Sequence, residues 1–358
     1  MREIGAEYLT SQRRSLAISV LVALVIVLDV AGVIDIVGAL NDLSTNLSGF
    51  WEATLVYAGM NAIIVVGLYY CASAGALSVA HASIAGMGAY MSAVLTTNFG
   101  WPFPAAILFG TGVGFLTGTF LAVATIRMNH LVAGLTTLAF GEAMAVVAFN
   151  IDYIGGANGF SGMPLNTSFG GVFLVLAILA FTTWRFDTSR LGYAARAVRD
   201  NPTVAAAMGI NVAWVRVLVF SLGCAIAGLG GTFRGHYILV QHPEDMTFFF
   251  SLTFVMFWVF GGSYTFLGPL FGAMFLTIVP EVLRFSLYER YIMYGLVLTV
   301  MIIMRPQGVI TRVPLGTQLR LFGLVDLVRE RRLPAWATGA LGHRSRDPAS
   351  APKGEEPD

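Results

Sequence analysis

Lysine is almost absent from this chain, and charged residues of both signs are scarce. The only lysine among 358 residues is Lys353, and charged residues make up 11% of the composition. A nucleotide-binding loop of the GxxxxGK[ST] type needs a lysine to reach the terminal phosphates, but Lys353 is followed by Gly-Glu-Glu. The sequence therefore excludes ATP hydrolysis by the P-loop route.

Cysteine and clustered histidine are also lacking. The two cysteines, Cys71 and Cys224, both lie in apolar runs, which excludes a disulfide framework. The five histidines show no HxxxH spacing, and the chain has no CxxC motif. We therefore expect no metal site and no cofactor in this chain.

Long apolar runs dominate what is present. Hydrophobic residues make up 56% of the chain, and the mean hydropathy is +0.75, which a water-soluble globule of this size could not cover with polar surface. About 20 apolar residues in a helix cross the hydrocarbon core of a bilayer. This rule predicts an all-α integral membrane protein with about ten spans, near 15–38, 54–71, 74–96, 103–126, 131–150, 170–184, 212–232, 247–261, 266–284 and 290–304. Only small residues separate the second span from the third and the eighth from the ninth, so one of these four is a candidate re-entrant segment.

The arginines orient these spans. With a cytoplasmic N-terminus, 18 of the 21 basic residues fall on cytoplasmic loops and only Arg234, Arg284 and Arg290 fall outside. This split follows the positive-inside rule, so we expect both termini in the cytoplasm. Gly110, Gly114 and Gly118 recur at every fourth residue in the fourth predicted span, which predicts a close helix-packing seam.

A polar segment at about 188–211 interrupts the apolar pattern on the cytoplasmic side. It reads as two short helices broken at Asn201-Pro202, because proline clashes with the preceding helical turn. The small residues after the break would give it a smooth surface. Two interpretations of this segment remain open: it is a docking element for a cytoplasmic partner, or it is a simple amphipathic connector.

A few polar residues lie inside predicted spans, where burying charge is costly. Glu142 is a candidate for the translocation pathway or for a hydrogen bond between helices. Ser78 and His81, three residues apart, are expected on one helix face, where they would contact the substrate or where the histidine would pair with a backbone carbonyl near a helix kink. On the predicted outer loops, Asn158, His236, His242 and Glu244 are candidates for docking a partner protein, although an ordinary solvated loop explains the last three more simply.

Six separated stretches resemble one known family. They are LSVAHASIAGMGAY at 77–90, TLAFGE at 137–142, GGANGFSGMP at 155–164, RAVRDNPTVAAAMGINV at 196–212, GGSYTFLGPLFGA at 261–273 and RPQG at 305–308. In this order they resemble the LivM-like permease subunits of branched-chain amino acid ABC importers.

The resemblance implies a type II-like fold, similar to that of vitamin B12-type importers, in a bacterial inner membrane. It implies a second homologous permease, two cytoplasmic ABC ATPases that bind ATP and Mg, and a periplasmic or lipid-anchored binding protein, with lipid around the permease and no nucleic acid. The chain itself would be no enzyme. The polar segment would then couple to an ATPase through Arg196, Arg199, Asp200, Pro202, Ala205, Ala206, Met208 and Gly209.

The chain departs from the family pattern at 72–81. The family's tyrosine and glutamine are replaced by Ser73 and Ala76. The substrate class therefore stays open between branched-chain or related amino acids and urea, short amides or other small carboxylates. A secondary transporter that uses Glu142, and an intramembrane enzyme that uses Ser78 and His81, are rival interpretations.

The expected domain organisation follows from these patterns. Residues 1–14 form a cytoplasmic segment and 15–310 form the permease domain. Residues 311–341 are predicted to be an amphipathic segment on the inner leaflet, because leucines and valines alternate there with arginines. Residues 342–358 are polar and proline-containing, which predicts a disordered tail.

Overall fold

A computed structural model of the chain describes residues 35–45, 47–128, 130–262, 265–282, 292, 294–297, 299–300 and 308–310. The chain divides into two units, residues 1–311 and 312–358, and all of the described residues belong to the first. The predicted cytoplasmic segment 1–14, most of the first and tenth spans, and the predicted segments 311–341 and 342–358 lie outside the described residues.

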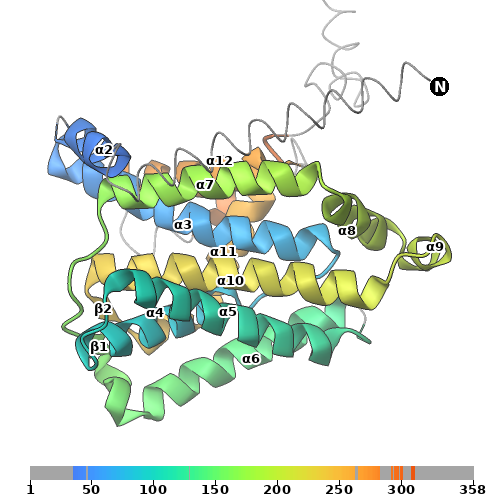
Figure 1. Cartoon of the computed structure of the whole chain (residues 1–358), viewed down its shortest axis with the longest axis horizontal. Helices are drawn as coiled ribbons and strands as arrows, with labels where there is room; N and C mark the ends of the chain where they lie inside the picture. Colours follow the sequence, from blue (N-terminus) through green and yellow to red (C-terminus); the bar gives the residue numbers. More distant parts are fainter. Residues whose placement is uncertain are drawn as a thin grey trace, which may run out of the picture. The chain divides into compact units, whose positions relative to one another are not determined.

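The described chain is helical, apart from one pair of two-residue strands (Figure 1). The helices are α2 (Ile36–Ser44), α3 (Gly49–Ser73), α4 (His81–Thr97), α5 (Phe103–Thr125), α6 (His130–Asn150), α7 (Phe169–Asp187), α8 (Arg190–Asp200), α9 (Pro202–Ala207), α10 (Val212–Ile238), α11 (Phe248–Gly261) and α12 (Leu267–Val282). The strands β1 (Phe160–Ser161) and β2 (Val240–Gln241) pair antiparallel, and the short 3₁₀ turns are η1 (Asp152–Ile154), η2 (Gly156–Asn158) and η3 (Pro243–Met246).

Helix α10 runs through the middle of the bundle and packs against α3, α4 and α5 (Figure 1). Gly110, Gly114 and Gly118 of α5 are all buried and face α10. A Cβ atom at Gly114 would lie within 2.4 Å of the backbone oxygen of Cys224, so only glycine permits this approach. The predicted packing seam is confirmed.

The packing seam predicts that alanine substitutions at two neighbouring glycines of α5 have different effects on stability. Gly114→Ala pushes a methyl group against the α10 backbone, and we expect a loss of about 1–3 kcal/mol of stability from overpacking. Gly112→Ala is the matched control, because a Cβ at Gly112 meets nothing within 4 Å. The thermal midpoint of the detergent-solubilised protein checks the pair, and equal midpoints would contradict the packing account.

The outward faces of α5 and α6 are apolar. Large hydrophobic side chains are exposed there, namely Leu108, Phe109, Leu116, Phe120 and Val123 on α5 and Val132, Leu135, Val146, Val147 and Phe149 on α6. By contrast α3 is buried on nearly all sides. Within the described residues five helices are long and apolar enough to cross a membrane, α3, α5, α6, α7 and α10, and α11 and α12 are shorter apolar helices. These helices fit an integral membrane protein, while the count of ten spans stays a prediction.

The prediction of a continuous span at 74–96 is wrong for its first residues. Helix α3 ends at Ser73, Gly75 takes a left-handed φ of 77°, and α4 begins only at His81. Side chains bind the freed backbone donors: Thr137 Oγ1 accepts from the Val79 amide at 3.0 Å, and Ser251 Oγ accepts from the Ala82 amide at 3.2 Å. Non-helical backbone is tolerated inside a membrane bundle when it is satisfied in this way.

Candidate functional site

The residues Ser78 and His81 are both completely buried, but they do not share a helix face. Ser78 lies in the connection before α4, and His81 is the first residue of that helix. The prediction of a shared face is therefore wrong, because the family-like stretch begins as a buried loop. The His81 Nε2 atom lies 3.9 Å from Cys71 Sγ, so its ring packs against the end of α3.

Glu142 on α6 connects two helices. Its carboxylate oxygen Oε1 accepts a hydrogen bond from the backbone amide of Phe248, the first residue of α11. A carboxylate at a helix N-terminus also interacts favourably with the helix dipole. Of the two interpretations in the sequence, this geometry favours the hydrogen bond between helices.

Two substitutions separate that role from ion coupling. Glu142→Gln keeps a side-chain oxygen for the Phe248 amide, and we expect transport within about twofold of the parent. Glu142→Leu leaves a half-buried donor, the Phe248 amide, without this acceptor, and we expect a loss of about 1 kcal/mol of stability. Thermal midpoints and substrate uptake check both variants. Abolished uptake in a well-folded Glu142→Gln variant would favour ion coupling instead.

The outer-loop residues divide into two groups. Asn158 and His242 lie next to the paired strands β1 and β2, and both are exposed, as is Glu244. The structure thus brings Asn158 and His242 to one end of the bundle although 83 residues separate them in the chain. His236 was predicted on the same loop, and this placement is wrong. It is fully buried in α10, where its ring nitrogens face Thr96 Oγ1 and the Thr232 carbonyl, each at 3.0 Å.

The polar segment at 188–211 folds as α8 and α9, with the predicted break at Asn201-Pro202 confirmed. Ser189 caps α8 by accepting from the Gly192 amide at 3.1 Å. The Asn201 side chain caps α9 by accepting from the amides of Thr203 and Val204, each at 3.1 Å. These caps fix two short helices at one end of the bundle (Figure 1).

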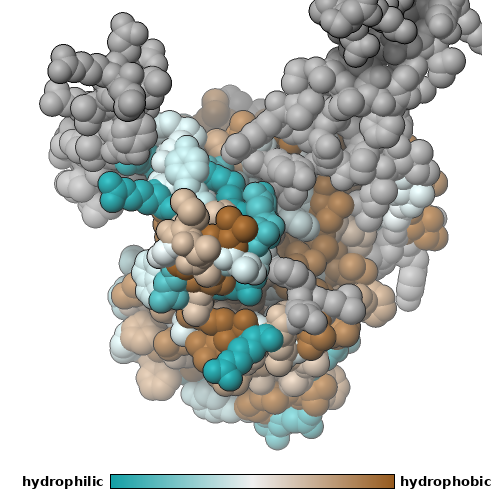
Figure 2. Space-filling model, turned by 90° about the vertical axis from the view of Figure 1, so that its right-hand side faces the viewer, coloured by the Kyte–Doolittle hydropathy of each residue, from teal (hydrophilic) through white to brown (hydrophobic). Residues whose placement is uncertain are grey.

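Not every residue predicted for coupling is accessible. Ala205 is buried against the bundle, whereas Asp200, Ala206, Met208 and Gly209 are exposed and Arg196, Arg199 and Pro202 are half-buried. Val204, which the prediction omitted, is an exposed apolar residue on α9. Figure 2 faces the end of the molecule that carries α8 and α9 and shows hydrophilic and hydrophobic groups side by side there. Such a mixed surface suits contact with another protein.

A buried polar cluster holds α8 to the bundle. The Tyr69 hydroxyl of α3 lies 2.8 and 2.9 Å from the two carboxylate oxygens of Asp187, the last residue of α7. Arg196 of α8 pairs with Asp187 Oδ1 at 3.4 Å and donates to the Asp187 carbonyl at 2.7 Å. Three helices therefore meet at one carboxylate.

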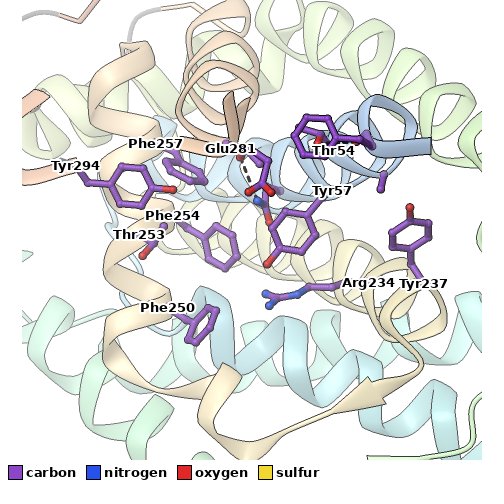
Figure 3. Close-up of a pocket in the computed structure, with 14 residues that line it drawn as sticks. Thr54, Tyr57, Arg234, Tyr237, Phe250, Thr253, Phe254, Phe257, Glu281 and Tyr294 are labelled. Carbon is purple, nitrogen blue, oxygen red and sulfur yellow. Dashed lines mark hydrogen bonds between the residues drawn. The ribbon is translucent and has the colours of Figure 1, made fainter. Parts of the chain in front are cut away.

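A cavity of about 450 Å³ lies between α3, α10, α11 and α12 (Figure 3). Its walls are mainly aromatic, with polar groups placed among them. One such group is Asn61, whose side-chain amide donates to Thr277 Oγ1 at 3.1 Å. A mostly apolar cavity with a few placed polar groups is the usual form of a small-molecule site.

Arg234 is the main cationic group of this cavity. Its side chain is only 9% exposed, and Nη2 lies 3.4 Å from Asp245 Oδ1. The guanidinium stacks over the rings of Tyr57 at 5.5 Å and Phe250 at 5.3 Å. The distribution of arginines placed Arg234 on an outer loop, but it lies inside α10. The signal that could have revealed this buried position is a single charged residue close to a long apolar run.

The described part of the chain contains no cluster of three or more histidine, cysteine, aspartate or glutamate side chains that could hold a metal ion. Cys71 and Cys224 are free and buried.

Comparison with known proteins identifies the family. A family model described as branched-chain amino acid transport system / permease component matches residues 50–305. The LivM permease protein of the high-affinity branched-chain amino acid transport system of Escherichia coli K12 is 27% identical over 299 residues, covering 72% of this chain and 68% of that protein. A probable branched-chain amino acid transport permease protein LivM of Methanocaldococcus jannaschii is 23% identical over 293 residues, covering 74% of this chain and 80% of that protein.

A further relative carries a different name. The nucleoside ABC transporter permease protein NupC of Lactococcus lactis is 29% identical over 203 residues, covering 49% of this chain and 64% of that protein. No solved structure matches the chain. Because the family model covers most of its length, this chain belongs to the family of branched-chain amino acid transport system permease components, the membrane-embedded subunits of ABC transporters.

Proposed function

We propose that this chain is the transmembrane permease subunit of an ATP-driven importer for branched-chain or related amino acids. It forms half of the translocation pathway in a bacterial inner membrane, beside a second homologous permease. Two cytoplasmic ATPases hydrolyse ATP, and a periplasmic or lipid-anchored protein delivers the substrate. The family membership carries this proposal, together with the absence of a P-loop lysine from the sequence.

The arrangement of α8 and α9 supports a division of labour between subunits. We propose that ATP binding closes the ATPase pair, that α8 and α9 move with it, and that the permeases rock between outward-open and inward-open forms. The contacts of Asp187 with Tyr69 and Arg196 would pass this movement into the bundle. The ends of α3, α10 and α11 that line the large cavity would face outward in the orientation predicted from the arginines.

Relatives named for other cargo keep a second substrate class open. A nucleoside permease and permeases of an autoinducer 2 import system are among them. Urea, short amides and other small carboxylates remain the alternative that the departure at 72–81 suggests. Under this alternative the same subunit architecture carries a different small polar molecule.

The proposal is tested by ligand-stimulated ATP hydrolysis. The permease pair is reconstituted in nanodiscs with its ATPases and binding protein and then screened with leucine, isoleucine, valine, other amino acids, nucleosides, urea and short amides. We expect branched-chain or related amino acids to raise ATP hydrolysis severalfold, while the chain without ATPases shows none. Stimulation by urea or short amides alone would show that these molecules, and not amino acids, are the substrates. Failure of any ATPase to associate would overturn the importer proposal.

A further inference from the structure

The cavity between α3, α10, α11 and α12 has two kinds of wall. Phe250, Phe254 and Phe257 lie along one face of α11 and give the cavity an apolar side. Thr54 and Asn61 of α3 and Thr277 of α12 contribute polar groups to its lining. A ligand that fits must therefore combine an apolar portion with a compact polar portion.

The guanidinium of Arg234 is under-bonded for its burial. A guanidinium carries five N–H donors, yet within the described residues its ion-pair partner is Asp245 at 3.4 Å, and its Nε finds no hydrogen-bond acceptor. Burying a charge without full pairing is costly. The aromatic rings of Tyr57 and Phe250 hold the group in place but accept no hydrogen bond in its plane. The Nε atom itself has no accessible surface, so a carboxylate in the cavity would pair with the terminal nitrogens of the guanidinium, in the planar geometry that arginine prefers.

A carboxylate of the protein lies in the same cavity. Glu281, near the end of α12, lines the wall that α12 contributes. In the view of Figure 3 the ring of Tyr57 lies between the Glu281 carboxylate and the Arg234 guanidinium, and the phenylalanines of α11 lie to one side. The cavity thus offers a cation and an anion on different helices, with an aromatic wall beside them.

We infer that this cavity is a binding site for an α-amino acid within the permease. The ligand's carboxylate pairs with Arg234, its ammonium group faces Glu281, and its aliphatic side chain lies against Phe250 and Phe254. The inference rests on the proposed importer function and adds a position and a recognition chemistry to it. The substrate would then be selected in the permease as well as in the binding protein.

Protection of an introduced cysteine tests the site directly. Cys71 and Cys224 are completely buried, so Thr253→Cys places the reactive thiol in the cavity. Its modification by N-ethylmaleimide is measured by mass spectrometry in the assembled permease–ATPase complex in nanodiscs. Leucine at saturation is expected to slow this modification by about fivefold or more. Thr45→Cys, exposed after α2, is the matched control whose modification leucine leaves unchanged.

Analogues and charge variants identify the two polar contacts. Isoamylamine lacks the carboxylate and 4-methylpentanoate lacks the amine, and each is expected to protect at least about tenfold more weakly than leucine. In the Thr253→Cys background, Arg234→Gln is expected to abolish protection by leucine, Arg234→Lys to weaken it, and Glu281→Gln to remove the preference for leucine over 4-methylpentanoate. Arg127→Gln, a loop arginine, is the matched control.

The outcomes separate this inference from the proposed function. Leucine-stimulated ATP hydrolysis without protection of Thr253→Cys would overturn the site and leave the importer standing. Equal protection by leucine and isoamylamine, or full protection in a folded Arg234→Gln variant, would also overturn the site. Protection that follows the expected order establishes it, even where the ATPase assay identifies a different amino acid as the best cargo.

Discussion

The Met208→Asp variant is expected to lower ATP-driven transport by at least ~100-fold while the permease itself stays folded, an effect typical of a charge placed in a protein interface. Met208 follows α9 and is 79% exposed, and Val204 on the same short helix is 57% exposed. Both side chains are mostly exposed, so an aspartate there costs the isolated permease little. In a contact with an ATPase, the same aspartate would bury an unpaired charge.

Co-purification and transport measure this effect. The ATPases are expected to dissociate from Met208→Asp during purification, and Val204→Asp should act in the same direction. Leu43→Asp is the matched control, because Leu43 is an exposed apolar residue of α2, at the other end of the bundle from α9 (Figure 1). A Met208→Asp variant that keeps its ATPases and transports normally would remove α9 from the coupling interface.

Loss of the Asp187 carboxylate is expected to be the most destabilising single change at the end of the bundle that carries α8 and α9. Asp187→Leu leaves the Tyr69 hydroxyl and the Arg196 guanidinium without a shared acceptor in a nearly buried position. Breaking a buried ion pair by removing one partner costs about 3–5 kcal/mol. Because α8 is tied to the bundle through this carboxylate, the coupling of ATP hydrolysis to transport should fall with stability.

A graded series checks that account. Tyr69→Phe removes one hydroxyl and keeps the ion pair, so a cost of only about 1 kcal/mol is expected. Asp200→Asn is the matched control, since the Asp200 side chain is 69% exposed and pairs with Arg199 on the surface, a type of pair worth below about 1 kcal/mol. Thermal midpoints are compared with transport per ATP hydrolysed. Equal midpoints for Asp187→Leu and Asp200→Asn would contradict the role of the cluster.

The features that the sequence predicted correctly depend on local patterns. Apolar length predicted the long helices, the four-residue spacing of Gly110, Gly114 and Gly118 predicted their contact with α10, and Asn201-Pro202 predicted the break between α8 and α9. Each of these needs only the periodicity of one helix or the steric effect of one residue.

The features that it missed depend on contacts between distant segments. Residues 74–80 are apolar enough to continue a helix. They form a buried loop instead, because Thr137 accepts a hydrogen bond from the Val79 amide and Ser251 accepts one from the Ala82 amide just after the loop. Hydropathy ended the seventh span at 232, so Arg234 and His236 were assigned to a loop that the structure shows as the last turns of α10. The cavity around Arg234 draws on four helices, and no single stretch of sequence contains it.

The central claim is that this permease moves its substrate only when separate ATPases drive it. Uptake of radiolabelled leucine into proteoliposomes tests this most directly, with the permease pair, ATPases and binding protein reconstituted together. We expect accumulation that requires ATP and vanishes when the ATPases are omitted or when Met208→Asp is introduced. Accumulation of a solute by the purified chain alone, driven by an ion gradient and indifferent to ATP, would contradict the account.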